Sequence, residues 1–176
     1  FTTKEMPRLS IVPPPNDTAS ARFRYDLSMF YWGLQQRRDT VRAAIAIRDA
    51  QYSLETIISE FSQPFGLRIS ELETPCIYLL LKESLATCDS ICTLPKLFWM
   101  RQRPFKELGI QSLTPWDEHA LQYSGSWPSG HTILGWSAAL LLSEINPERA
   151  DTLLARGIQF GESRIVAGVH WSSDVE

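Results

Sequence analysis

Apolar residues recur along this chain at helical spacing, and no stretch sustains the alternation expected of a β-strand. Helices are predicted over residues 19–32, 41–52, 54–61, 75–94, 131–143 and 148–169. Asp17-Thr18, Thr40, Ser53 and Thr74-Pro75 supply residues typical of helix starts. The predicted fold class is therefore all-α, with one domain built as a helical bundle.

Proline and glycine residues mark where the predicted helices and the helical domain are expected to begin and end. Residues 1–17 contain a run of prolines and are predicted to form an extended arm, leaving residues 18–176 as the helical domain. Gly33 is expected to end the first helix, and Pro95 to kink or restart the long one. Residues 103–127 read as a long loop, and loops of that length tend to be functional. Ser172-Ser173-Asp174 has the character of a cap opening a further helix, which the chain end at Glu176 cuts short.

Composition narrows the possible partners. The 176 residues carry 17 basic and 20 acidic side chains, a net charge of −3, which gives no overall attraction to nucleic acid or to an anionic membrane. Any affinity for anions must then be local. No apolar run reaches the roughly 20 residues of a transmembrane helix, so no membrane span is expected.

Cysteine content and the chain start leave questions open. Because Cys76, Cys88 and Cys92 are three, at least one thiol is unpaired within the chain, and the sequence does not say which two could pair. The chain begins at Phe1 without an apolar leader, which fits either a trimmed cytosolic protein or an exported protein whose signal peptide has been removed.

Three separated segments carry residues suited to binding one phosphate. They contribute three cations, a glycine-containing helix start, two histidines and a carboxylate: Lys96 and Arg103; Ser129, Gly130 and His131; Arg164, His170 and Asp174. Guanidinium groups match phosphate oxygens with paired donors, and free amides at a helix start attract anions. Lys96, Arg103, Ser129, Gly130 and Arg164 are the predicted phosphate ligands.

The two histidines fit complementary roles in phosphoryl transfer. One must be neutral to attack phosphorus, and the other must be protonated to give the leaving alkoxide a proton. Asp174, four residues after His170, suits a partner that fixes its tautomer, so His170 is the predicted nucleophile and His131 the predicted acid. No metal or other cofactor is called for, because side chains supply the positive charge.

Three motifs follow one another along the chain: Lys96-x6-Arg103-Pro104, Pro128-Ser129-Gly130-His131 and Ser163-Arg164-x5-His170-x3-Asp174. Together they resemble the three-part signature of the type 2 phosphatidic acid phosphatase and vanadium haloperoxidase superfamily. Further segments resemble the sequences of bacterial class A non-specific acid phosphatases: Gly125-Ser126-Trp127, Glu144-Ile145-Asn146-Pro147 and Val12-Pro13-Pro14-Pro15. One departure is Pro95, directly before Lys96.

The resemblance implies a periplasmic, metal-independent phosphomonoesterase with an acid optimum and a broad substrate range that includes nucleotides. It implies an oligomer of identical chains, a phosphohistidine on His170 and inhibition by vanadate in the phosphate pocket. The alternatives are a haloperoxidase with vanadate as cofactor, a lipid phosphatase, and a phosphate- or nucleotide-binding module without turnover. Both histidines are intact, which argues against the last, and the absence of a membrane span argues against the lipid enzyme.

Overall fold

A computed structural model describes residues 8–176, and the first seven residues of the predicted arm lie outside the described part. Every regular element within residues 8–176 is helical, which confirms the all-α prediction. The elements are α1 (Arg8–Ile11), α2 (Ala21–Gln36), α3 (Thr40–Arg48), α4 (Leu54–Glu60), α5 (Ser62–Phe65), α6 (Pro75–Trp99), α7 (Pro104–Leu108), α8 (Pro115–Leu121), α9 (Gly130–Ile145), η1 (Pro147–Arg149), α10 (Ala150–Val166) and α11 (Ser172–Val175).

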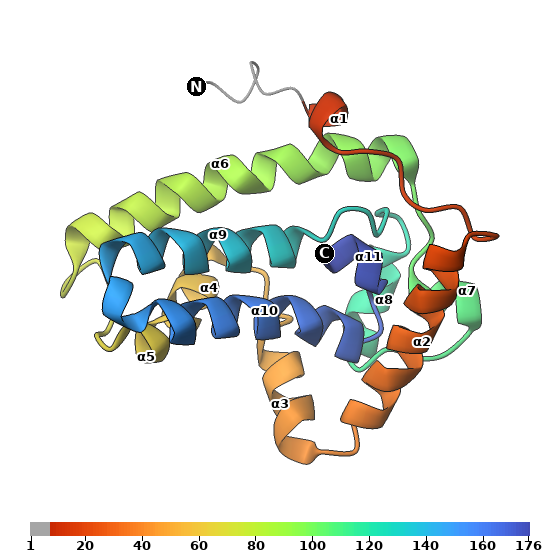
Figure 1. Ribbon diagram of the computed structural model, residues 1–176, viewed down its shortest axis with the longest axis horizontal. Helices are drawn as coiled ribbons and strands as arrows, with labels where there is room; N and C mark the ends of the chain where they lie inside the picture. The colour runs from red at the N-terminus through yellow and green to blue at the C-terminus, as the bar shows by residue number, and fades with distance from the viewer. Residues whose placement is uncertain (1–7) are drawn as a thin grey trace.

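The long helices α6, α9 and α10 run side by side (Figure 1). Their facing stripes form the main core, in which Leu81 and Leu85 of α6 meet Leu134 of α9 and Phe160 of α10. Helix α4 adds Ile57 to the same cluster. The short helices α7, α8 and α11 gather with α2 at one end of these long helices, and that end holds the predicted site residues (Figure 1).

Helix α2 does not end at Gly33 as predicted but continues to Gln36. A Cβ on Gly33 would lie 2.7 Å from the backbone oxygen of Ile165, so the glycine is needed for close packing of α2 on α10. The helix begins at Ala21 and is capped by Ser20, whose Oγ accepts the N–H of Phe23, a little later than Asp17-Thr18 suggested. Asp39, one residue before the expected Thr40, likewise caps α3.

Pro95 does not break α6. The helix runs unbroken from Pro75 to Trp99, with Pro95 buried inside it. A proline removes one backbone hydrogen bond, and packing on the buried side of the helix offsets that loss here. Lys96 therefore stays on the long helix rather than at the start of a new one.

The segment expected to be a long loop contains two short helices, α7 and α8, each with a proline in its first turn. The arm predicted over residues 1–17 is not extended throughout its described part. Residues 8–11 form one helical turn beside α6, whereas residues 13–17 contain no helix (Figure 1).

The three cysteines are all free thiols. Within residues 8–176, no helix combines the length and the apolar character that crossing a bilayer requires.

Candidate active site

A cavity of about 400 Å³ opens where α6, α10 and the start of α9 converge. Six of the eight predicted site residues line it: Lys96, Arg103, Gly130, His131, Arg164 and His170. Segments separated by more than 70 residues in sequence thus place three cations and two imidazoles around one space. Ser129 and Asp174 lie behind its wall rather than on it.

Arg164 is the most unusual of the three cations. Its side chain is 1% exposed, and its Nε and Nη1 atoms have no hydrogen-bond partner among the described residues. Burial, followed by the nearby charge of Arg103, lowers the pKa of Arg164 to about 10. Leaving a buried guanidinium unpaired is costly, so the cavity is built to receive an anion.

Lys96 and Arg103 are held in place by backbone carbonyls. Lys96 Nζ donates to the carbonyl of Gly125 at 3.2 Å, and Arg103 Nη2 donates to the same carbonyl at 3.3 Å. Arg103 Nε also donates to the carbonyls of Leu121 and Ser124, at 3.0 Å each. Burial, and then the charge of Arg103, lowers the pKa of Lys96 to about 7. Carbonyls fix the positions of these cations without neutralising them.

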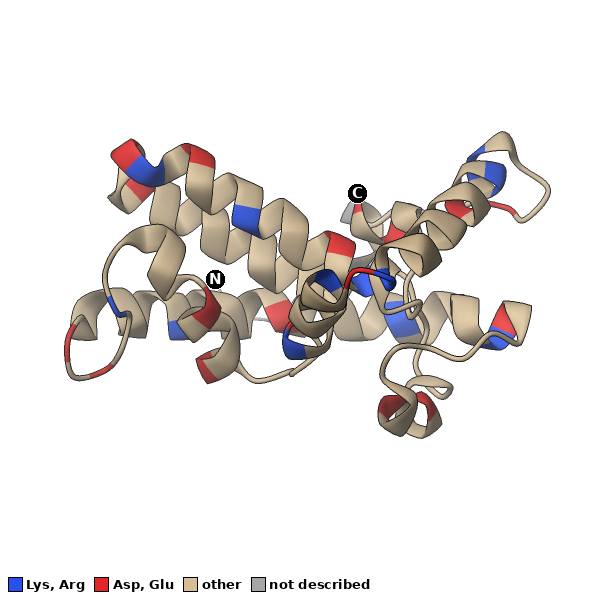
Figure 2. Cartoon of the chain, turned by 90° about the horizontal axis from the view of Figure 1, so that it is seen from below, with Lys and Arg blue, Asp and Glu red and all other residues tan. Residues whose placement is uncertain are grey.

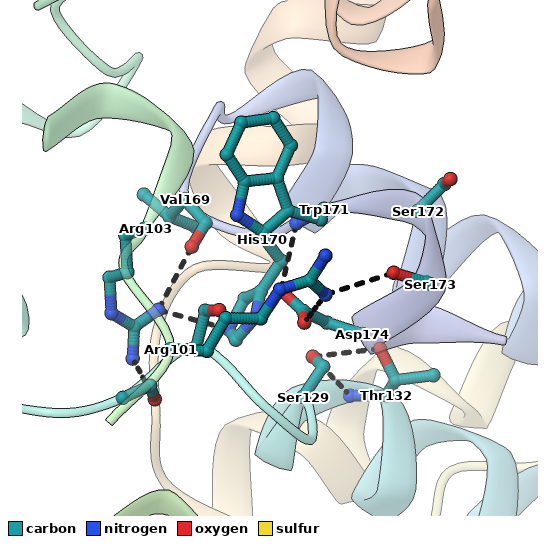
Figure 3. Close-up of polar contacts among 12 residues, drawn as sticks. Arg101, Arg103, Ser129, Thr132, Val169, His170, Trp171, Ser172, Ser173 and Asp174 are labelled. Atoms are coloured by element: carbon teal, nitrogen blue, oxygen red, sulfur yellow. Dashed lines mark hydrogen bonds and ion pairs between the residues drawn. The ribbon is translucent and has the colours of Figure 1, made fainter. Parts of the chain in front are cut away.

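The contacts of His170 define its tautomer. Arg103 Nη1 lies 3.1 Å from His170 Nε2, and because a guanidinium only donates, Nε2 must accept. The ring proton is then on Nδ1, which lies 3.4 Å from Asp174 Oδ2 (Figure 3). Burial, followed by the charges of Arg103 and Lys96, holds the pKa of His170 well below its ordinary value. His170 is therefore neutral, with a lone pair on Nε2.

Arg101, which no pattern in the sequence indicated, is the group that holds Asp174. Arg101 Nη1 donates to Asp174 Oδ1 at 2.5 Å and to Ser173 Oγ at 2.9 Å, and its Nη2 donates to Asp26 of α2 at 2.8 Å (Figure 3 shows the first two contacts). Both carboxylates are fully buried. Burial raises the pKa of Asp174, while Arg101 and the N–H of Trp171 act to lower it.

Asp26 completes this buried network. It accepts hydrogen bonds from the Ser172 hydroxyl, the Ser173 hydroxyl and the Ser173 N–H, all between 2.7 and 2.8 Å. The start of α11 is therefore fixed to α2, and Arg101 connects that anchor to the carboxylate behind His170. In the sequence, the only local indication of this arrangement was that Ser172 and Ser173 are residues typical of a helix cap.

His131 sits across the cavity with its ring against Tyr52, the centroids being 4.6 Å apart. Its Nε2 lies 3.1 Å from the carbonyl of Ala50, and because a carbonyl only accepts, Nε2 carries a proton. Burial, and then the charge of Arg164, holds the pKa of His131 well below its ordinary value. His131 is therefore neutral, and a second proton would go on Nδ1.

Ser129 is the cap of α9. Its Oγ accepts from the N–H of Thr132 at 3.3 Å and from the Thr132 hydroxyl at 2.9 Å (Figure 3). Its own N–H donates to the backbone oxygen of Asp174 at 2.9 Å. Ser129 thus joins the start of α9 to α11, and Gly130 and His131 form the cavity wall.

The other large hollow among the described residues has a different lining. A hollow of about 530 Å³ on another face is lined mainly by apolar side chains, including Met29, Trp127 and Ile158, and by no lysine or arginine. Acidic and basic positions are intermixed along the whole length of the molecule (Figure 2). Within residues 8–176, no three His, Cys, Asp or Glu side chains are grouped closely enough to share a metal ion.

Comparison with known proteins adds an independent line of evidence. Residues 77–176 match the model of the PAP2 superfamily. The chain is 39% identical over 169 residues to the non-specific acid phosphatase of Providencia stuartii, covering 96% of this chain and 68% of that protein. It is 39% identical over 166 residues to the non-specific acid phosphatase of Salmonella typhimurium, covering 94% of this chain and 66% of that protein. An acid phosphatase of Zymomonas mobilis is 35% identical over 170 residues, covering 97% of this chain and 64% of that protein. The chain spans about two thirds of the length of these relatives.

Proposed function

Because this chain belongs to the PAP2 superfamily and groups with bacterial non-specific acid phosphatases, we propose that it hydrolyses phosphate monoesters through a phosphohistidine on His170. The observation that carries the proposal is the buried, unpartnered guanidinium of Arg164, which shares a cavity with two further cations and two neutral histidines. A phosphoryl group is the anion whose charge and three non-bridging oxygens match this set of donors.

In the first step, Arg164, Arg103, Lys96 and the amides at the start of α9 hold the phosphoryl oxygens. Arg103 gives up its contact with His170 Nε2 in favour of a phosphate oxygen, which frees the lone pair. Nε2 then attacks phosphorus, and the bond from phosphorus to the ester oxygen breaks. Asp174, held by Arg101, stabilises the positive charge that develops on the imidazole through the Nδ1 proton.

The leaving alkoxide takes a proton from His131 Nδ1. This requires His131 to carry two protons, although burial and Arg164 hold its pKa low. The negative charge of a bound phosphoryl group offsets that effect, so substrate binding and acid pH together prepare the acid. Water then attacks the phosphohistidine, giving its proton to His131, and inorganic phosphate leaves with His170 Nε2 free again.

The reaction as proposed needs no metal or other cofactor, because the side-chain cations stabilise the transferring charge. Vanadate, which has the shape and charge of phosphate, should inhibit in the same cavity. The proposal also includes nucleotides among the substrates, export to the periplasm and assembly into a homo-oligomer. These are tested by nucleotide hydrolysis, cell fractionation and light scattering of the purified protein.

The central experiment measures hydrolysis of p-nitrophenyl phosphate from about pH 4 to 8 in the presence of EDTA. We expect activity that peaks in acid, and ³²P-labelled substrate should leave label on His170 after rapid quenching and peptide mapping. His170→Ala should abolish both, whereas His119→Ala, a change at an exposed histidine outside the cavity, should affect neither. Strict dependence on an added metal, or label on His131 in place of His170, would refute the proposed mechanism.

A further inference from the structure

The cavity contains polar groups that the hydrolysis mechanism does not use. Tyr52, which packs against His131, donates its hydroxyl to Asp89 Oδ1 of α6. Tyr52 and Asp89 both line the cavity that Arg164 lines with its unpartnered guanidinium. Burial and the neighbouring carboxylate raise the pKa of Tyr52, so the phenol remains a donor at any physiological pH. These two side chains therefore present a fixed carboxylate and a ring beside the predicted acid.

The position of Asp89 follows from the geometry of α6. Successive residues on one face of a helix are three or four positions apart. This spacing links Asp89 to Cys92 and Thr93, and links those two residues to Lys96. All four side chains line the cavity. Seven residues separate Asp89 from Lys96, a rise of about 10 Å along the helix axis. The carboxylate thus lies on the same wall of the cavity as Lys96, about two helical turns away from it.

A substrate that places its phosphoryl group on the cations must direct its leaving group past His131, because that histidine protonates the ester oxygen. The leaving group then lies beside the Tyr52 ring, which is about half exposed, and reaches toward Asp89. A second carboxylate, Asp117 of α8, also lines this cavity. The cavity therefore combines two carboxylates with its three cations.

Resting on the proposed phosphatase activity, we propose that Asp89, held by Tyr52, is a specificity-determining residue that selects the leaving group. It favours neutral or cationic leaving groups with hydroxyl donors, such as polyols and nucleosides, because its free oxygen lone pairs accept their hydrogen bonds. It disfavours leaving groups that carry a carboxylate or a second phosphate, because like charges repel in a partly desolvated space.

Two substrates of the same three-carbon skeleton test this selection. Glycerol 1-phosphate ends in a hydroxymethyl group where 3-phosphoglycerate has a carboxylate. The wild-type protein should have the higher kcat/KM for glycerol 1-phosphate. Asp89→Asn keeps an acceptor for the Tyr52 hydroxyl but removes the charge, and it should lower the ratio of the two kcat/KM values by about tenfold, the order expected when one charge–charge repulsion is lost in a partly hydrated site. Asp89→Lys should lower the ratio further.

Glu83→Gln is the matched control, because Glu83 is an exposed carboxylate on α6 outside the cavity. It makes the same change in net charge and should leave the ratio unchanged. Equal ratios in the wild type, Asp89→Asn and Asp89→Lys would overturn the assignment while leaving the phosphatase activity in place. A wild-type protein that fails to hydrolyse even p-nitrophenyl phosphate would instead overturn the proposed function and this selection with it.

Discussion

Arg101 is the residue whose replacement should test the buried network most directly. Its guanidinium is 8% exposed and lies between two carboxylates, Asp26 and Asp174, that are fully buried. Arg101→Met keeps the apolar stem and removes the charge. Breaking a buried ion pair from one side costs about 3–5 kcal/mol, because the remaining charge is left without compensation.

The structure favours the lower end of that range. Asp26 would keep its hydrogen bonds from the two hydroxyls of Ser172 and Ser173 and from the Ser173 N–H. Asp174 would keep the N–H of Trp171 at 2.8 Å. We therefore expect Arg101→Met to lower the free energy of unfolding by about 3 kcal/mol, measured by urea denaturation at pH 7.

The same substitution should change the pH dependence of catalysis. Burial raises the pKa of Asp174, and Arg101 is the main group opposing that rise. Without Arg101 the carboxyl group should take up a proton at higher pH, and a neutral carboxyl group stabilises a charged His170 poorly. The kcat of Arg101→Met should thus fall more at pH 5 than at pH 7, a change that a purely structural defect would not produce.

Arg68→Met is the control, because the ion pair of Arg68 with Glu73 is exposed and should contribute at most about 1 kcal/mol. A double-mutant cycle with Asp174→Asn should show that the effects of the two changes are not additive, since both act on one contact. If Arg101→Met unfolds at the wild-type urea concentration and retains the wild-type pH profile, the reasoning about this network is wrong.

Three further predictions concern the cavity itself. Because the pKa of Lys96 is lowered to about 7, inhibition by sulfate, whose charge is constant above pH 6, should weaken between pH 6 and 8, and Lys96→Arg should remove that dependence. The pKa values of His131 and His170 are lowered in the folded protein, so in acid the unfolded chain binds more protons than the folded one. The free energy of unfolding, measured without phosphate, should therefore fall as the pH decreases below about 6.5. The slope should reach up to roughly 1.4 kcal/mol per pH unit for each histidine. Replacing both histidines by Gln should flatten this urea-denaturation profile, and a profile that stays steep would contradict the assignment. Gly125→Ala would bring a Cβ to 2.4 Å from the backbone oxygen of Lys96, so kcat/KM should fall at least tenfold, and a wild-type value would show that the two segments are not in close contact.

Much of the fold followed from apolar periodicity, and the errors have a common cause. Gly33 and Pro95 are residues that usually end helices, yet both lie inside one. At Gly33 the close approach of α10 excludes a side chain, and at Pro95 the helix continues because its buried side packs on the core. Local propensity is a weak guide where tertiary contacts determine the outcome.

The candidate site was predictable to the extent that its residues lie in short motifs. Lys96, Arg103 and His170 became candidates because three motifs occur together in the sequence, and the structure brings all three residues to one cavity. Arg101 could not be predicted in this way, because the motif specifies no residue type between Lys96 and Arg103, and its partner Asp26 lies 75 residues away in sequence. No local pattern connects these two residues, and only the packing of α2 against α11 reveals that they cooperate.

The attachment of α11 to Asp26 has a consequence for how the molecule acquires activity. Ser172 and Asp26 are 146 residues apart, so the contact closes only when nearly the whole chain has been gathered. Helical structure can form from local contacts long before that closure, whereas contacts between distant parts of a chain form slowly. During refolding, the recovery of phosphatase activity should therefore lag behind the recovery of the far-ultraviolet helical signal, and its rate should report the docking of α2 onto α11.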